Sequence, residues 1–279
     1  MTHDSTSVLD RIRRALPGLG SPFPPGRVAI LRLYGPIGGA GRTAEWIELA
    51  KGLRESKRVP AVVLDIDSPG GGAAASEDLF LAIERLTAAK PVVAAIRGTG
   101  ASGAYLAAMA AQHIVSTPTA IVGSIGVIAA GPRVPRLLDR LGVTVSEHTA
   151  GRLKGIGAPW REERPEESAK EQEIVDAIYD AFVERVATGR SLDPGRAREL
   201  ATGEVWLGTQ ALELGLVDDI GDLERAVEIA AERAGVPAKS GVVRIRRPFI
   251  GRLLDRFAGR VASSLADEIE IRISDRYRL

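Results

Sequence analysis

The 279-residue sequence has no cysteine, three histidines and few aromatic residues. Without cysteine there can be no disulfide, no thiol nucleophile and no thiolate metal site. The histidines are His3, His113 and His148. Because a metal site usually needs two or more convergent ligands, so few imidazoles make a histidine metal centre an unattractive hypothesis, and no metal site is expected.

The sequence also has almost no net charge and no long apolar run. The 37 basic and 36 acidic residues nearly cancel, so no overall field favours nucleic acid as a partner. No segment approaches the roughly 20 apolar residues that span a bilayer, and the N-terminus lacks the apolar core of a secretory signal. A globular protein in the cytoplasm, without a transmembrane helix or a nucleic-acid partner, is therefore expected.

From Arg27 onward, short β-branched runs alternate with helical patterns. This alternation is typical of parallel strands joined by crossover helices, and it predicts an α/β fold. The predicted strands are 28–33, 61–66, 92–96, 114–116 and 143–148. The predicted helices are 43–56, 73–87, 103–111, 133–141, 172–188, 197–200, 209–214 and 222–234.

Composition divides the chain into three parts. Residues 1–26 are rich in proline and predict a flexible leader, residues 27–235 a single α/β domain, and residues 236–279 a C-terminal tail. Within the domain, residues 162–188 are too long for a simple connector and predict an exposed arm. In the tail, residues 249–265 predict an amphipathic helix with arginines opposite an apolar stripe. Such a helix fits peripheral contact with an anionic membrane or packing onto another subunit, and both interpretations stay open.

Two glycine-rich corners follow predicted strands. In the first, Ser68-Pro69 precedes three glycines, Gly70 to Gly72. Consecutive glycines let backbone N–H groups approach an oxyanion or a phosphate, although an ordinary strand-to-helix turn is the alternative. No Gly-Lys-Ser/Thr follows, which excludes a P-loop.

The second corner places Ser102 among small residues, directly before a predicted helix. Unpaired N–H groups at a helix start can stabilise an alkoxide or a tetrahedral oxyanion, which favours a nucleophile. The alternative is structural, because serine is also a preferred helix N-cap. Sequence alone leaves both roles open.

A nucleophilic serine needs a base. His113 lies about 15 Å away, at the other end of the helix that follows Ser102, and His148 has no evident acidic partner. Lys154 is the better candidate, because it lies among small and apolar residues in a chain with six lysines against 31 arginines. To act as a base it needs burial that lowers its pKa from the usual value of about 10.4.

These motifs resemble signal peptide peptidase A, a family of bacterial Ser–Lys peptidases with the Clp/crotonase-like fold. The resemblance covers roughly residues 28–235, and Lys154 follows Ser102 by 52 residues. Five motifs occur in the family's order: 68–72, 101–103, 123–127, 151–159 and 208–221. The resemblance implies repeated ββα units with a parallel sheet and flanking helices.

The resemblance also implies roles for single residues. Ser102 matches the nucleophile, Lys154 the general base and Ser124 the serine that hydrogen-bonds the lysine, and we assign Gly71 and Gly103 to the oxyanion hole. Family members use no cofactor and form ring or dome homo-oligomers, in which serine and lysine can come from neighbouring subunits. Their substrates are signal-peptide remnants and other unstructured apolar peptides.

Two rival functions remain. Ala104 and Gly155 depart slightly from the family pattern, and the corners of a silent scaffold could serve packing alone. An acyl-CoA hydratase or isomerase is the other rival, since that chemistry needs an oxyanion hole and often a carboxylate, for which Glu77 is the nearby candidate.

Overall fold

The computed structural model describes residues 26–38 and 42–243. The leader through residue 25 and the tail from residue 244, with its predicted amphipathic helix, lie outside the described residues. The described residues belong to a compact unit that spans Phe23–Val243. Among them, no helix combines the length and the apolarity that a membrane span requires.

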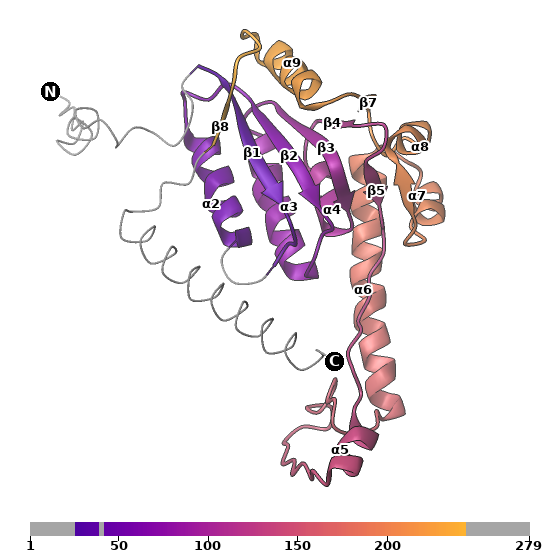
Figure 1. Cartoon of the computed structure of the whole chain (residues 1–279). Coiled ribbons are helices and arrows are strands. Elements are labelled where there is room, and N and C mark those ends of the chain that lie inside the picture. The colour runs from indigo at the N-terminus through magenta and orange to yellow at the C-terminus, as the bar shows by residue number, and fades with distance from the viewer. Residues whose placement is uncertain (1–25, 39–41, 244–279) are drawn as a thin grey trace, which may run out of the picture. The chain divides into compact units, whose positions relative to one another are not determined.

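A twisted, mainly parallel sheet forms the centre of this unit (Figure 1). The strand order is β6-β5-β3-β2-β1-β8, and β4 pairs with both β3 and β7. Only the β5–β6 pair is antiparallel among these strands. The strands are β1 (Val28–Tyr34), β2 (Val62–Ser68), β3 (Val92–Ala101), β4 (His113–Ser116), β5 (Ile121–Gly123), β6 (Val205–Leu207), β7 (Asp219–Ile220) and β8 (Ser240–Val242). The α/β prediction is confirmed.

Helices cover the two faces of the sheet unequally. Three helices, α2 (Arg42–Glu55), α3 (Ala73–Thr87) and α4 (Gly103–Met109), cover one face and form the larger apolar core with it. On the other face, α9 (Leu223–Ala234) covers the N-terminal halves of the strands, where the buried residues are apolar. β3, buried on both faces over its first half, carries the chain into α4. The two short helices α7 (Pro194–Leu200) and α8 (Gly208–Glu213) complete the unit.

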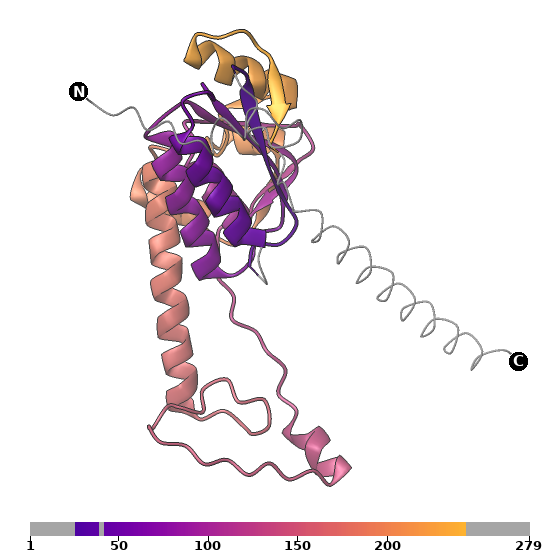
Figure 2. The same ribbon diagram turned by 90° about the vertical axis from the view of Figure 1, so that its left-hand side faces the viewer.

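An arm leaves the sheet after β5 (Figures 1 and 2). The chain runs out to the short α5 (Pro135–Leu141), makes a long loop, and returns along α6 (Pro165–Gly189). With 25 residues, α6 is about 37 Å long at 1.5 Å per residue. It begins seven residues earlier than predicted, because Pro165 suits the first helical position and the Glu167 carboxylate accepts from the Arg164 N–H at 3.1 Å.

The prediction of a strand over residues 143–148 is wrong. The structure shows no strand there; the segment belongs to the arm and its side chains are exposed. Val143 and Val145 alternate with polar residues as in a strand, but none of the strands in the described part of the chain pairs with them. At the other end of the domain, β8 pairs with β1, so the sheet extends past the boundary predicted at residue 235.

Candidate active site

Ser102 lies at the turn from β3 into α4, in a conformation that few L-residues adopt. Its φ is 53° and its ψ is −126°, and its side chain makes no capping hydrogen bond to α4. Such backbone strain costs about 1–3 kcal/mol, so surrounding contacts must hold it. One is the Ser102 N–H, which donates to the Gly123 carbonyl at 2.7 Å. Ser102 therefore occupies the N-cap position without capping α4 through its side chain, and no partner within the described residues holds its hydroxyl.

The first glycine corner packs directly against this turn. A Cβ at Gly70, whose φ is +88°, would lie 2.9 Å from the Ser102 Cβ and 2.6 Å from the Gly103 nitrogen. Real Cβ atoms do not approach that closely, and a positive φ also favours glycine. The glycine at this position lets the loop after β2 touch the serine turn.

Two backbone N–H groups beside Ser102 are unpaired. Ile37 bridges the corner, because its N–H donates to the Gly70 carbonyl and its carbonyl accepts from the Gly72 N–H. A parallel bridge of this kind leaves the Gly71 N–H on the opposite side. Within the described residues, neither the Gly71 nor the Gly103 N–H has a hydrogen-bond partner. A Cβ at Gly103 would lie 3.6 Å from the Gly71 nitrogen, so the two predicted oxyanion-hole residues lie close together.

Ser124 directly follows β5, one of the strands that pair with β3. Ala101 pairs in parallel register with Gly123, so Ser102 and Ser124 leave neighbouring strands at the same edge of the sheet. Adjacent strands lie about 4.8 Å apart. Ser124 also has a positive φ, 50°, and its N–H donates to the Glu204 carbonyl at 2.7 Å. The structure therefore brings Ser102, Ser124, Gly71 and Gly103 together.

A cavity of about 550 Å³ opens beside Ser102. Its walls come from the glycine corner, from α3 and α4, from the chain after Ser124 and from the C-terminal half of α6. Most of the lining is glycine, alanine or apolar, and Glu77 is its one charged residue. The larger apolar side chains are Leu106, Val127, Ile128, Ile178 and Phe182. This composition suits an apolar side chain of a bound ligand.

Lys154 lies elsewhere, in the loop at the far end of the arm, and is exposed. The segment that leads into α6 holds this loop, because Arg164 donates to the Arg152 carbonyl at 2.9 Å and Arg161 donates to the Gly155 carbonyl at 2.8 Å. The Ser102 cavity instead touches α6 at residues 177–182. The start of α6, beside the Lys154 loop, and the α6 residues beside the cavity are about 14 residues apart, which is about 20 Å along the helix. Within one chain, Ser102 and Lys154 are not brought together.

Glu167 organises the loop around Lys154, although the sequence patterns did not single it out. Its side chain is only 1% exposed and accepts hydrogen bonds from Arg161 at 2.7 and 2.8 Å and from Arg164 at 2.6 Å. These bonds, that from Arg161 first, hold the pKa of Glu167 well below its usual range. A Pro-Glu-Glu sequence at a helix start predicts a capping acid, but not its burial between two arginines.

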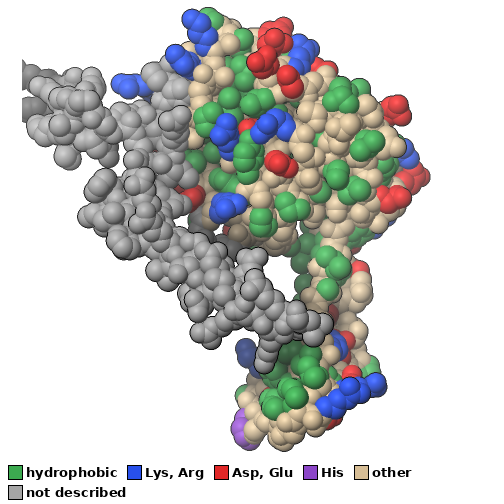
Figure 3. Space-filling model, viewed as in Figure 1, with side chains coloured by type: hydrophobic (Ala, Val, Ile, Leu, Met, Phe, Trp, Pro, Cys, Tyr) green, Lys and Arg blue, Asp and Glu red, His purple; other side chains and the backbone are tan. Residues whose placement is uncertain are grey.

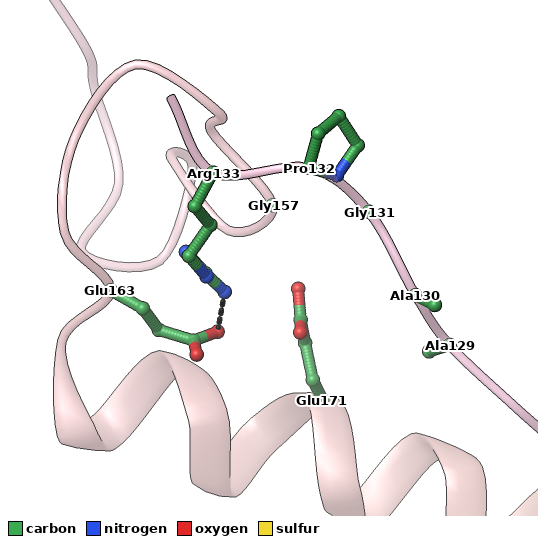
Figure 4. Close-up of a pocket in the computed structure, with 8 residues that line it drawn as sticks. All are labelled: Ala129, Ala130, Gly131, Pro132, Arg133, Gly157, Glu163 and Glu171. Atoms are coloured by element: carbon green, nitrogen blue, oxygen red, sulfur yellow. Dashed lines mark ion pairs between the residues drawn. The ribbon is translucent and has the colours of Figure 1, made fainter. Parts of the chain in front are cut away.

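A second cavity, of about 480 Å³, lies inside the arm (Figure 4). Arg133 and Glu163 form an ion pair of 2.6 Å on one side, and Glu171 projects from α6 toward the same space. Gly157 and residues 129–132 complete the lining. None of the predicted site residues lines this cavity. Among the described residues, no three acidic or histidine side chains converge as a metal site would require.

Neither described histidine lies near Ser102. His113 begins β4 and pairs in register with Val93, nine residues before Ser102 along the neighbouring strand, which corresponds to about 30 Å. Burial lowers the pKa of His113, whose ring lies 3.9 Å from the Asp218 carboxylate. His148 is exposed on the arm. The position of His113 argues against that histidine as a base for Ser102, whereas His148 lies on the same arm as Lys154 and its position does not separate the two.

Comparisons with known proteins add an independent line of support. The pattern described as "Peptidase family S49" matches residues 84–237. The sequence is 38% identical over 212 residues to "Putative protease slr0021" of Synechocystis sp., which covers 75% of each chain. It is 35% identical over 226 residues to "Serine protease SPPA, chloroplastic" of Arabidopsis thaliana, over 79% of this chain and 33% of that protein. It is also 38% identical over 179 residues to "Putative signal peptide peptidase SppA" of Enterococcus faecium, over 64% and 52% of the two chains. The matches thus cover between a third and three quarters of these relatives.

Proposed function

Because this chain belongs to peptidase family S49, and is a serine peptidase by that membership, we propose that it cleaves peptide bonds with Ser102 as the nucleophile. The main support is the strained Ser102 turn, with a free hydroxyl beside two unpaired N–H groups and an apolar cavity. A turn of this kind exposes a nucleophile at the end of a strand.

In the proposed reaction, the Ser102 oxygen attacks the carbonyl carbon of the scissile bond and gives its proton to a base. The Gly71 and Gly103 N–H groups donate to the oxyanion of the tetrahedral intermediate. The C–N bond then breaks, the base returns the proton to the leaving amine, and an acyl-enzyme remains. Water, deprotonated by the same base, hydrolyses this ester and regenerates Ser102.

We assign the base to Lys154 of a neighbouring subunit. The separation of about 20 Å within one chain argues for a pair shared between two copies. Burial against a second subunit would favour the neutral amine that a general base requires. Ser124, beside Ser102, would then accept from the incoming lysine and orient it.

Shared sites require a homo-oligomer, and the arm carries apolar side chains suited to one. Figure 3 shows hydrophobic side chains gathered at its far end. Residues Ile128 and Leu141 are 86% and 66% exposed. Other exposed apolar side chains of the arm are Leu137, Val143, Val145, Trp160, Ile174 and Ile178. Light scattering tests this proposal; a strict monomer that cleaves peptides would exclude a shared pair.

The proposed substrates are unfolded peptides with apolar side chains, including remnants of signal peptides, because the cavity beside Ser102 is apolar. Peripheral membrane contact by the tail stays a prediction, as does a cytoplasmic location. Liposome flotation, with and without residues 248–279, tests the contact. An intact protein that ignores anionic vesicles would exclude it.

Labelling with a fluorophosphonate or a peptide boronate, followed by mass spectrometry of the chain, tests the proposed nucleophile. The expected adduct lies on the peptide that contains Ser102, and Ser102→Ala abolishes it. His113→Ala and His148→Ala are the controls and remain labelled and active. A folded wild-type protein that hydrolyses no peptide and takes no label would instead support a silent scaffold or an acyl-CoA enzyme.

A further inference from the structure

The apolar cavity beside Ser102 contains one charge, and that charge has a partner. Glu77, on the second turn of α3, is the single charged residue in the lining. Its carboxylate lies 2.6 Å from the Arg185 guanidinium of α6. Both side chains remain partly accessible, at 41% for Glu77 and 34% for Arg185. A ligand in the cavity therefore meets an ion pair instead of a lone carboxylate.

Arg185 is not itself part of the lining, but α6 places it beside residues that are. It follows Ile178, Ala181 and Phe182 by seven, four and three residues, and these spacings put all four side chains on one face of the helix. Those three residues line the cavity. The Arg185 guanidinium also lies 4.4 Å from the centroid of the Phe80 ring. Stacking and pairing together fix its position.

Charge balance decides which side chains such a cavity accepts. An unpaired Glu77 would attract a lysine or arginine side chain and would be costly to desolvate against an apolar one. Arg185 offsets that charge, and its guanidinium also lies 3.9 Å from the carboxylate of Glu84, which is not part of the lining. An uncharged ligand side chain then leaves no ion unpaired.

We propose that the Glu77–Arg185 pair is the specificity-determining element of this cavity and selects peptides with an apolar, uncharged side chain there. The proposal rests on the proposed function, because it concerns substrates of Ser102. It also gives Glu77 a role other than acid–base chemistry: its carboxylate is held in an ion pair at the edge of the cavity.

The test compares three variants on peptide sets with leucine, lysine or glutamate scanned through each position near the scissile bond. Arg185→Met keeps an unbranched side chain on the Phe80 ring but removes the charge. It is expected to raise kcat/KM for lysine peptides relative to leucine peptides about fivefold, as for loss of a partly exposed ion pair. Glu77→Gln shifts the preference toward glutamate by a similar factor. The double variant restores the preference for leucine.

Arg198→Met is the matched control. Arg198 also pairs with a carboxylate, Asp180, at 2.7 Å and lies over an aromatic ring, that of Tyr179, at 5.5 Å. Unlike Arg185, it pairs with a carboxylate that does not line the cavity, so its variant should keep the wild-type preference. Circular dichroism confirms the folding of each variant.

Two failures are distinguishable. If the wild type cleaves peptides and labels at Ser102 but Arg185→Met and Glu77→Gln keep its preference, the specificity proposal is wrong. If the folded wild type neither cleaves peptides nor takes the label, the proposed function itself is wrong.

Discussion

Substituting alanine for Gly103 tests how closely α3 packs against the turn that carries Ser102. A Cβ there would lie 2.0 Å from the Ser76 Oγ and 2.7 Å from the Ser76 Cβ. Ordinary contact begins at 3.4 Å, so one side must move by 3.4 − 2.0 = 1.4 Å. Ser76 is held by a 2.9 Å hydrogen bond to the Gly72 carbonyl, and the strain therefore falls on the turn that carries Ser102.

Overpacking of this kind costs about 1–3 kcal/mol of stability. The effect on catalysis is larger, because a displacement of about 1 Å in a reacting group can lower the rate about 100-fold. Gly103→Ala is therefore expected to fold with a lower melting temperature and to lose about two orders of magnitude in kcat/KM and in the rate of labelling by a peptide boronate.

A second substitution separates crowding from other causes. Ser76→Gly removes both atoms that the new methyl would meet, so Ser76→Gly/Gly103→Ala should recover most of the activity of the Ser76→Gly single variant. Peptide hydrolysis and boronate labelling are measured on all four proteins, with thermal unfolding as the folding control. Full activity of Gly103→Ala, or no recovery in the double variant, would refute the reasoning.

Three further predictions concern other parts of the site. Ser124→Ala should lower turnover less than Ser102→Ala does, because an orienting hydrogen bond contributes a few kcal/mol at most; steady-state kinetics of both variants measure the difference. Glu167→Gln should lower turnover because the loop around Lys154 loses its support, and hydrogen exchange of that loop should rise. Since the pKa of Glu167 is lowered in the folded state, its support is present above about pH 4 and is lost as the pH falls further, so wild type and variant should exchange alike in acid. Tyr105→Phe removes the hydrogen bond from a buried hydroxyl to the Leu216 carbonyl, 2.7 Å long, and should cost about 1–3 kcal/mol of unfolding free energy in urea titrations without moving the site.

Local patterns were enough to predict β2, β3 and the two glycine corners that follow them, but not β5, whose Gly123 carbonyl accepts from the Ser102 N–H. β-branched runs followed by small residues and a helical pattern mark strand–turn–helix units, and both glycine corners lie at the C-terminal ends of such strands. Glycines cluster where two backbone segments pack closely, as the clash that a Cβ would make at Gly70 shows. Residues 92–111 were therefore predicted as strand, turn and helix, although β3 (Val92–Ala101) continues five residues past the predicted end of the strand at residue 96.

Contacts between residues far apart in the sequence could not be predicted from local patterns. Residues 143–148 alternate like a strand, but a strand forms only where a partner is available, and on the arm there is none. The burial of Glu167 between Arg161 and Arg164 was hidden, because charged residues near a helix start usually indicate a solvated surface. The distance between Ser102 and Lys154 depends on where the arm points, which no local pattern encodes.

The proposed Ser102–Lys154 pair between subunits is tested most directly by mixing two inactive variants. Ser102→Ala supplies an intact Lys154, and Lys154→Ala supplies an intact Ser102. The two proteins are unfolded and refolded together, with each refolded alone as a control, and peptide hydrolysis is measured. Recovery of activity in the mixture alone is predicted, because some interfaces then join an intact serine to an intact lysine. A mixture that forms mixed oligomers yet stays as inactive as its components, beside a refolded wild type that is active, would contradict the account.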